Sequence, residues 1–253
     1  MANSGEFSIG AVIRRTIDVL GGNMPMFLGI AFVFNLLPQV LSVLATMLLT
    51  PALSVRSSAG SGALMLWPFV PALLVLIVGA MGKGALVEAG LATSEGRPCS
   101  FASAVSVGIR AFPSNLGIIF LDYLGVGFAS ILLVVPGMML LCRWIAAVPA
   151  NVAERPGVLG ALGRSRDLTA GHRWRIFGLL LIFGLLSAAV PVTAMLIGFR
   201  QNQMAVLSAG SVVVALSSVV FALVGGVGIA AIYVELRAAR GEGLSLNLIS
   251  AFE

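Results

Sequence analysis

Long uncharged stretches dominate the chain. No Asp, Glu, Lys or Arg occurs in the 37 residues between Asp18 and Arg56, or in the 34 residues between Arg200 and Glu235. A helix needs about 20 apolar residues to cross roughly 30 Å of hydrocarbon. These stretches lack the alternation of polar and apolar residues that is typical of membrane strands. The pattern predicts six membrane-spanning helices, at about 24–49, 63–86, 115–135, 137–153, 175–199 and 209–235.

Prolines mark three places in this layout. Pro38 lies inside the first predicted span and Pro191 inside the fifth, where a membrane helix tolerates a kink. Pro136 and Gly137 lie between the third and fourth spans, and they predict a tight turn that closes a short hairpin.

The composition excludes several classes of protein. Hydrophobic residues make up 59% of the chain and charged residues 10%, whereas about a quarter of the residues in a soluble domain are charged. A soluble enzyme is therefore excluded. The net charge of +5 is too small for a protein that coats nucleic acid, and the two cysteines, Cys99 and Cys142, exclude a domain built on disulfides. We predict an all-α integral membrane protein with one membrane domain over residues 1–253.

Basic residues are distributed unevenly between the two sides of the predicted bundle. If both termini are cytoplasmic, 13 of the 15 Lys and Arg residues lie on or near the inner side, and Arg56 and Arg200 face outward. This bias satisfies the positive-inside rule. The first residues, MANSGEF, lack the basic region and apolar stretch of a signal peptide. The sequence thus predicts a multi-pass protein with both termini in the cytoplasm.

Three segments on the inner side have an amphipathic helical pattern. They cover about 9–20, 101–112 and 158–168, and Pro113 is expected to end the second. Such helices lie in the membrane interface or pack beneath the bundle, and the sequence leaves both arrangements open. Each precedes a two-span hairpin. Repeats are common in transporters, although duplication of any stable hairpin gives the same pattern. The predicted repeat units are about 7–98, 99–156 and 157–243.

Charged residues within or beside the spans are the candidates for chemistry. Asp122 and Arg143 lie on successive spans at similar depth, so we expect an ion pair, with a substrate or headgroup site as the alternative. Lys83 and Arg143 hold similar places in successive hairpins. The two cations could bind one anionic phosphate together, or each side chain could extend separately to the headgroups of the inner leaflet. The segment around His172 mixes bases with an aromatic ring, which suits anionic headgroups. The candidates for contact with a headgroup or substrate are Lys83, Arg143, Arg164, His172, Arg173 and Arg175.

The sequence contains no motif of a catalytic or metal site. The single histidine has no Cys or carboxylate at ligand spacing. No Ser-His-Asp order, phosphate-binding Gly-rich loop or HExxH sequence occurs. We therefore expect no enzyme activity, no catalytic residues, no metal and no cofactor.

The middle of the chain carries a string of residues with a known counterpart. In order, it consists of Pro136-Gly137, Arg143-Trp144, Val148-Pro149, Glu154, Ala161-Leu162, Arg164-Ser165, Asp167-Leu168-Thr169, Gly171, Trp174 and Phe177-Gly178. Over 130–185 the chain resembles a family of bacterial six-span inner-membrane proteins related to the membrane domain attached to some glycerophosphodiester phosphodiesterases. The resemblance implies a bacterial inner-membrane location and a six-span architecture. In that family the phosphodiesterase chemistry belongs to a separate soluble barrel, for which this sequence has no counterpart.

The sequence is compatible with several classes of function. We favour a non-catalytic protein of lipid or envelope homeostasis that binds anionic lipid headgroups. This choice rests on the basic residues of the predicted inner side, the amphipathic segments and the resemblance. The alternatives are a small-solute transporter or channel, an intramembrane enzyme that acts on lipids, and an accessory subunit of a membrane complex. The expected partner is membrane phospholipid and not nucleic acid. A protein partner and a homo-oligomer stay open.

Overall fold

A computed structural model of the protein describes residues 7–56, 69–132, 134–200 and 203–242, which form helices joined by short turns. The helices, in chain order, are α1 (Ile9–Gly22), α2 (Met24–Ala31), the π-helix η1 (Phe32–Leu36), α3 (Leu37–Arg56), α5 (Phe69–Ser94), α6 (Phe101–Leu132), α7 (Val134–Trp144), α8 (Ala147–Glu154), α9 (Gly157–Thr169), α10 (Arg173–Arg200) and α11 (Gln203–Ala239). No strand occurs in the described ranges. The start of the predicted span at 63–68 and the segment MANSGEF up to residue 6 lie outside them.

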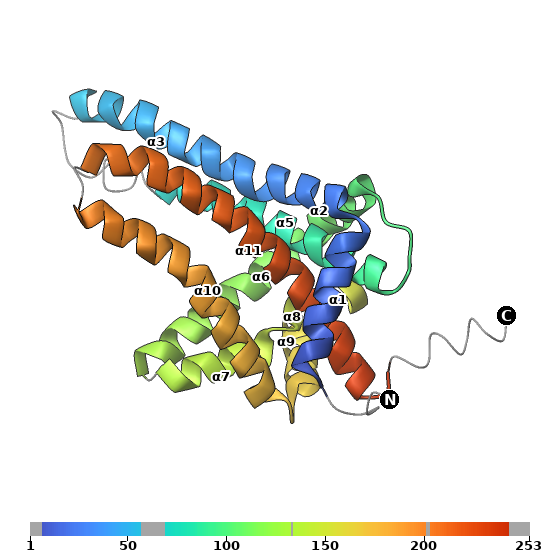
Figure 1. Ribbon diagram of the computed structural model, residues 1–253. Helices are drawn as coiled ribbons and strands as arrows, with labels where there is room; N and C mark the ends of the chain where they lie inside the picture. The colour runs from blue at the N-terminus through green and yellow to red at the C-terminus, as the bar shows by residue number, and fades with distance from the viewer. Residues whose placement is uncertain (1–6, 57–68, 133, 201–202, 243–253) are drawn as a thin grey trace.

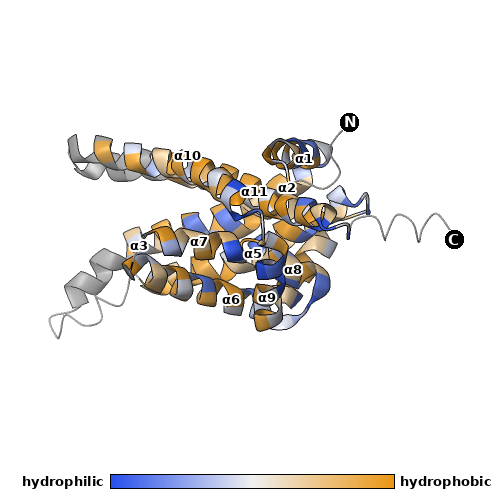
Figure 2. Cartoon of the chain, turned by 90° about the horizontal axis from the view of Figure 1, so that it is seen from below, coloured by the Kyte–Doolittle hydropathy of each residue, from blue (hydrophilic) through white to orange (hydrophobic). Residues whose placement is uncertain are grey.

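Six segments are long and apolar enough to cross a membrane, which confirms the prediction of a multi-pass, all-α membrane protein. They are Met24–Leu48, Phe69–Ser94, Phe101–Ile131, Val135–Glu154, Arg173–Thr193 and Val213–Ala239. Large apolar side chains on these segments are exposed, among them Phe128 at 63% and Leu185 at 65%. Figure 2 shows apolar residues along the helix surfaces and hydrophilic residues mainly around α8, α9 and the end of α11. This distribution suits helices surrounded by lipid.

Helix α5 is the centre of the bundle. It packs against α6, α11, α3 and α8, while α10 lies at the edge and contacts α11 and α7 (Figure 1). The start of α1, the end of α11 and the helices α8 and α9 gather at the same end of the molecule. Arg15 of α1 forms an ion pair with Glu235 of α11, at 2.8 Å between Nη2 and Oε1.

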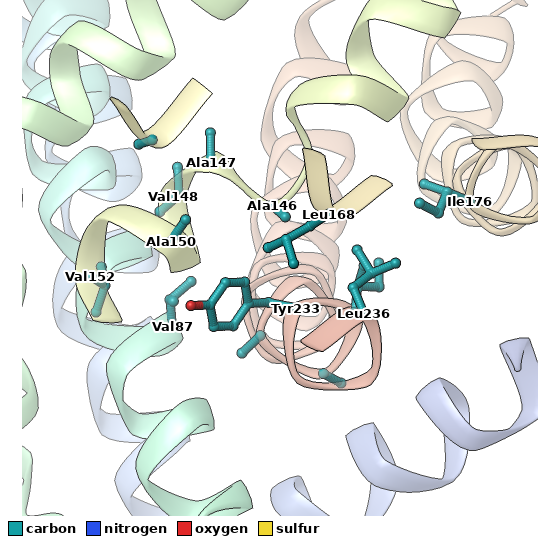
Figure 3. Close-up of a cluster of buried hydrophobic side chains, with 14 of the residues drawn as sticks. Val87, Ala146, Ala147, Val148, Ala150, Val152, Leu168, Ile176, Tyr233 and Leu236 are labelled. Atoms are coloured by element: carbon teal, nitrogen blue, oxygen red, sulfur yellow. The ribbon is translucent and has the colours of Figure 1, made fainter. Parts of the chain in front are cut away.

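A core of buried residues lies at this end, where α8, α9 and α11 meet. Tyr233, Leu168 and Ala147 are each fully buried, and Figure 3 shows Tyr233 between α8 and the side chain of Leu168. Many of the neighbouring core residues are alanines, which allow the helix backbones to approach one another closely.

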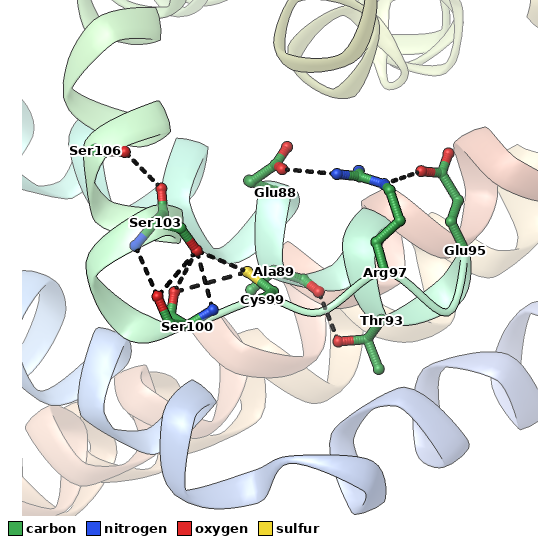
Figure 4. Close-up of polar contacts among 9 residues, drawn as sticks. All are labelled: Glu88, Ala89, Thr93, Glu95, Arg97, Cys99, Ser100, Ser103 and Ser106. Carbon is green, nitrogen blue, oxygen red and sulfur yellow. Dashed lines mark hydrogen bonds and ion pairs between the residues drawn. The ribbon is translucent and has the colours of Figure 1, made fainter.

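Helix α6 begins at a reciprocal cap. The backbone N–H of Ser103 donates to Ser100 Oγ at 3.2 Å, and the N–H of Ser100 donates to Ser103 Oγ at 2.9 Å (Figure 4). This is a capping box with serine in place of the usual acidic residue. In the preceding turn, Arg97 forms ion pairs with Glu95 at 2.7 Å and with Glu88 at 3.5 Å. The connection from α5 to α6 is therefore stabilised by ion pairs at its start and by the serine cap at its end.

Two proline-based expectations were wrong. Pro113 does not end a separate amphipathic helix, because α6 continues through it to Leu132. Pro136 and Gly137 do not form the hairpin turn, because α7 already begins at Val134. Pro136 thus lies in the first turn of a helix, where the missing N–H would have no helical partner. Helix α10 likewise continues through Pro191.

The first and fourth spans depart from regular α-helix. The first contains η1, in which the N–H of Leu37 donates to the carbonyl of Phe32, and Pro38 follows immediately. The fourth is broken at residues 145–146, between α7 and α8. The amphipathic segments α1 and α9 pack onto the bundle, α1 through Val12 and Val19 and α9 through Leu168. The three repeat units stay a prediction.

Candidate functional site

The break between α7 and α8 is held together by one serine of α9. Ser165 Oγ donates to the carbonyl of Arg143 at 2.8 Å and accepts from the N–H of Ala146 at 3.1 Å. Thr169 Oγ1 donates to the same Arg143 carbonyl at 3.4 Å. The last turn of α7 and the first turn of α8 leave backbone groups without helical partners, and Ser165 satisfies one on each side. These bonds fix the backbone of Arg143 against α9.

Three arginines come together at this point. Arg143 lies in the last turn of α7, Arg166 lies on α9, and Arg173 begins α10, which packs against α7. Arg143 is repelled by the charges of Arg166 and Arg173 and attracted by Asp167. We call Arg143, Arg166, Arg173 and Asp167 the arginine cluster. With three cations and one carboxylate, it carries a formal charge of +2.

Two donors of the arginine cluster are buried and unsatisfied. The Nε atoms of Arg143 and Arg173 have no hydrogen-bond partner among the described residues. An enclosed donor without a partner is unfavourable, even where the rest of the guanidinium group reaches the surface. An anion that accepted hydrogen bonds from both guanidinium groups would relieve this penalty and the mutual repulsion of the three charges.

Aromatic residues flank the arginine cluster on α10. Trp174 is 70% exposed and packs edge-on against Phe177, with 5.9 Å between ring centroids. His172 lies beside Phe7, with 5.8 Å between the rings, and Arg175 Nη1 donates to the Phe7 carbonyl at 2.8 Å. An exposed tryptophan beside arginines is typical of the membrane interface. Of the predicted residues, His172 and Arg175 thus fasten the residues before α1 to α10.

Arg164 forms ion pairs within the fold, so it is not available to bind a ligand. Its Nε donates to both oxygens of Glu154 at 3.0 Å, and its Nη1 donates to Glu242 Oε1 at 3.1 Å. A second ion pair joins its Nη2 to Glu242 Oε2. The hydrogen bond with Glu242 raises the pKa of the Arg164 guanidinium, and the same bond lowers the pKa of the Glu242 carboxyl. Tyr233 also donates to Glu154 Oε1, at 2.6 Å.

The expected ion pair between Asp122 and Arg143 does not form among the described residues. Asp122 Oδ1 is buried without a hydrogen-bond partner, and the charge that acts on Asp122 is that of Lys83 on α5. Lys83 and Arg143 do not converge either, because Lys83 lines a cavity between α5, η1, α10 and α11. The reason is that α6 packs along α5, which turns Asp122 toward α5.

Apart from the arginine cluster, a hollow of about 530 Å³ lined by charged residues lies between α5, α8 and α11. Its lining contains three arginines and three glutamates, namely Arg97, Arg155, Arg237, Glu88, Glu95 and Glu154. Its three arginines and three glutamates cancel in formal charge, and Glu88 and Glu95 bind Arg97. Arg237 Nε has no hydrogen-bond partner among the described residues, but it lies 3.7 Å from Glu242 Oε2. The arginine cluster has no such balance, which makes it the stronger candidate for an anion.

Sequence reasoning missed several polar residues of this region. Ser165 belongs to the string of residues that carries the resemblance, and Arg166 follows it in the chain, but the roles of both depend on the break in the fourth span, which the sequence pattern did not reveal. A second missed contact is a buried amide pair, in which Asn151 Nδ2 donates to Asn115 Oδ1 at 2.8 Å. In the described ranges, no group of three or more His, Cys, Asp or Glu side chains is arranged to hold a metal ion.

Comparison of the chain with models of protein families finds no match, and comparisons with curated proteins and with solved structures find none either.

Proposed function

We propose that this membrane protein binds an anionic phospholipid, with the phosphate of the headgroup held by the arginine cluster. The observation that carries the proposal is the pair of buried, unpartnered Nε donors on Arg143 and Arg173. A phosphodiester supplies acceptor oxygens for both, and arginine is well suited to bidentate contact with phosphate. The formal charge of +2 matches the one or two negative charges of an anionic phospholipid.

The surroundings of the arginine cluster support a lipid in preference to a free phosphate. The cluster lies where α7 ends inside the fourth span and where α10, the fifth span, begins. Trp174 beside it is exposed, and so are large apolar side chains farther along α10, such as Leu185. A lipid whose phosphate bound here would lay its acyl chains along α7 or α10. We further propose that the protein resides in the bacterial inner membrane, as the resemblance implies, with both termini cytoplasmic, as the distribution of basic residues indicates. We propose that it has no catalytic role and serves lipid or envelope homeostasis.

A lipid titration tests the proposal. The purified protein in a neutral detergent is titrated with phosphatidylglycerol or phosphatidylcholine, and its thermal unfolding is followed. We expect phosphatidylglycerol to raise the unfolding temperature saturably and phosphatidylcholine to have little effect. Loss of one charge-assisted hydrogen bond weakens binding by about 1.5–3 kcal/mol, so Arg173→Gln should lower the affinity for phosphatidylglycerol by about 10- to 100-fold.

The matched control is Arg110→Gln, which removes the same charge from an exposed position on α6. It should bind phosphatidylglycerol like the wild type. Equal loss in both variants would mean that only net charge matters, and the arginine cluster would not be a site. Equal stabilisation of the wild type by inorganic phosphate would assign the cluster to a free anion instead of a lipid.

A further inference from the structure

The π-helix in the first span has a cause in the sequence. Pro38 has no N–H and cannot donate to the carbonyl of residue 34, and its ring crowds that carbonyl. The backbone widens just before it, so that the N–H of Leu37 bonds to Phe32, five residues earlier. Single π turns inside helices occur frequently at functional sites. Here the turn contains Asn35, a polar residue in the first of the apolar spans.

The π turn brings Asn35 to the centre of the bundle. Ser218 Oγ on α11 donates to Asn35 Oδ1 at 2.9 Å, which leaves the N–H groups of the Asn35 amide available. Gly82 of α5 has no side chain at the point where it meets Phe34, and a Cβ there would overlap the Phe34 side chain. This close approach brings Lys83, the next residue, to the same cavity as Asn35.

The cavity has a volume of about 300 Å³ and two polar residues among apolar ones. Lys83 and Asn35 share its lining with Phe34, Phe183, Phe221 and Gly226. This composition, with a few polar groups in a mostly apolar hollow, is typical of sites for small ligands. Glycines contribute to the open space, since Gly226 adjoins Leu86 of α5 and Gly225 adjoins Phe183 of α10.

Lys83 lies in this cavity without a contact partner. No hydrogen bond or ion pair to Lys83 occurs in the described part of the chain, and Asp122 acts on it only at longer range from α6. Asp122 is not part of the cavity lining. An ionisable residue within a membrane span is expensive and marks a functional site when it faces a cavity. The cavity therefore offers one cationic donor and one amide donor, and no carboxylate.

We propose that this cavity binds a long-chain fatty acid, whose carboxylate accepts hydrogen bonds from Lys83 Nζ and Asn35 Nδ2. The single positive charge of Lys83 matches the single charge of a carboxylate, and the two oxygens of a carboxylate match the two donor groups. The aromatic and aliphatic walls suit an apolar chain and offer nothing to a fully polar solute. This site is separate from the arginine cluster, so the proposal does not rest on the proposed function.

The composition of the chain provides a direct experiment, because Lys83 is its only lysine. Protein labelled with ¹³C in lysine alone and reconstituted in phosphatidylcholine nanodiscs gives one set of lysine signals by NMR. Oleate is titrated, with oleyl alcohol and acetate as comparisons. We expect a saturable shift of the lysine Cε signal at one oleate per chain, and no shift with oleyl alcohol or acetate.

Each other outcome overturns the proposal in a different way. An equal shift with acetate would assign the cavity to small soluble anions, and equal shifts with oleyl alcohol would mean that the membrane alone responds. No shift with any of the three would mean that the cavity holds only water or lipid chains. Addition of phosphatidylglycerol reports on the arginine cluster separately and should leave the lysine signal in place.

Two variants assign the contact. Asn35→Leu removes the second donor and should weaken oleate binding by about tenfold or more. Gln39→Leu removes a carboxamide from the same span outside the cavity lining, and oleate should bind to it as to the wild type. Equal affinity in the two variants would show that Asn35 does not contact the carboxylate.

Discussion

Replacement of Ser165 by alanine tests how the broken span is held. The hydroxyl is fully buried and satisfies the N–H of Ala146 and the carbonyl of Arg143, one on each side of the break. Ser165→Ala leaves the N–H of Ala146 without a partner and leaves the carbonyl with only the longer bond from Thr169. A buried backbone group without a partner destabilises by about 1–3 kcal/mol. We therefore expect a loss of about 1–3 kcal/mol in the free energy of unfolding.

Reversible unfolding in mixed micelles of detergent and sodium dodecyl sulfate, followed by circular dichroism, measures this loss. The control is Ser187→Ala, because the Ser187 hydroxyl donates only to the carbonyl of Gly184 within its own helix, at 3.0 Å. That variant should stay within about 0.5 kcal/mol of the wild type. If both variants lose the same amount, Ser165 does not connect the two halves of the span, and the placement of Arg143 has another cause.

Three further predictions concern helix contacts and the charge network. Gly108→Ala should lower the free energy of unfolding by about 1–3 kcal/mol in the same assay, because the new Cβ would lie 2.7–2.8 Å from backbone atoms of α5. Gly127→Ala on the same helix is the control, because its Cβ would have no atom within 4 Å, and it should be neutral. Glu242 has a folded pKa below its ordinary value of 4.5 because it binds an arginine. Its contribution is therefore present above about pH 4.5 and is lost as the pH falls through the lower folded value, so Glu242→Gln should flatten that part of the stability–pH curve. A double-mutant cycle on Asn115 and Asn151, each changed to alanine, should give a coupling energy of about 0.6–1.7 kcal/mol, and a value near zero would contradict the hydrogen bond between them.

The spans were predictable because their signal is strong and local. Uncharged stretches longer than a bilayer crossing leave few alternatives to helices, and all six spans occur in the structure. Proline was a poorer guide. Pro113 predicted an interruption that did not occur, and Pro136 lies inside α7 instead of in the turn before it. Proline is tolerated in a first helical turn and within membrane helices.

The candidate site was predictable only in its residue types. Arg143 and Arg173 were candidates from their sequence positions, and both belong to the arginine cluster. Their grouping with Arg166 depends on the break in the fourth span, and Ser165 stabilises that break from a different helix. Asp122 was assigned to Arg143 because the two lie on successive spans at similar depth. Rotation of each helix about its own axis decides which side chains face one another, and hydrophobic stretches apolar on all sides carry little information about that rotation.

The most direct test of the central claim is native mass spectrometry of the protein released gently from detergent, with identification of the lipid that remains bound. We predict one anionic phospholipid per chain in the wild type, and its loss when Arg143 and Arg173 are both changed to glutamine. A wild-type protein that carries no lipid, or that carries zwitterionic lipid in the proportion found in the surrounding membrane, would contradict the assignment of the arginine cluster.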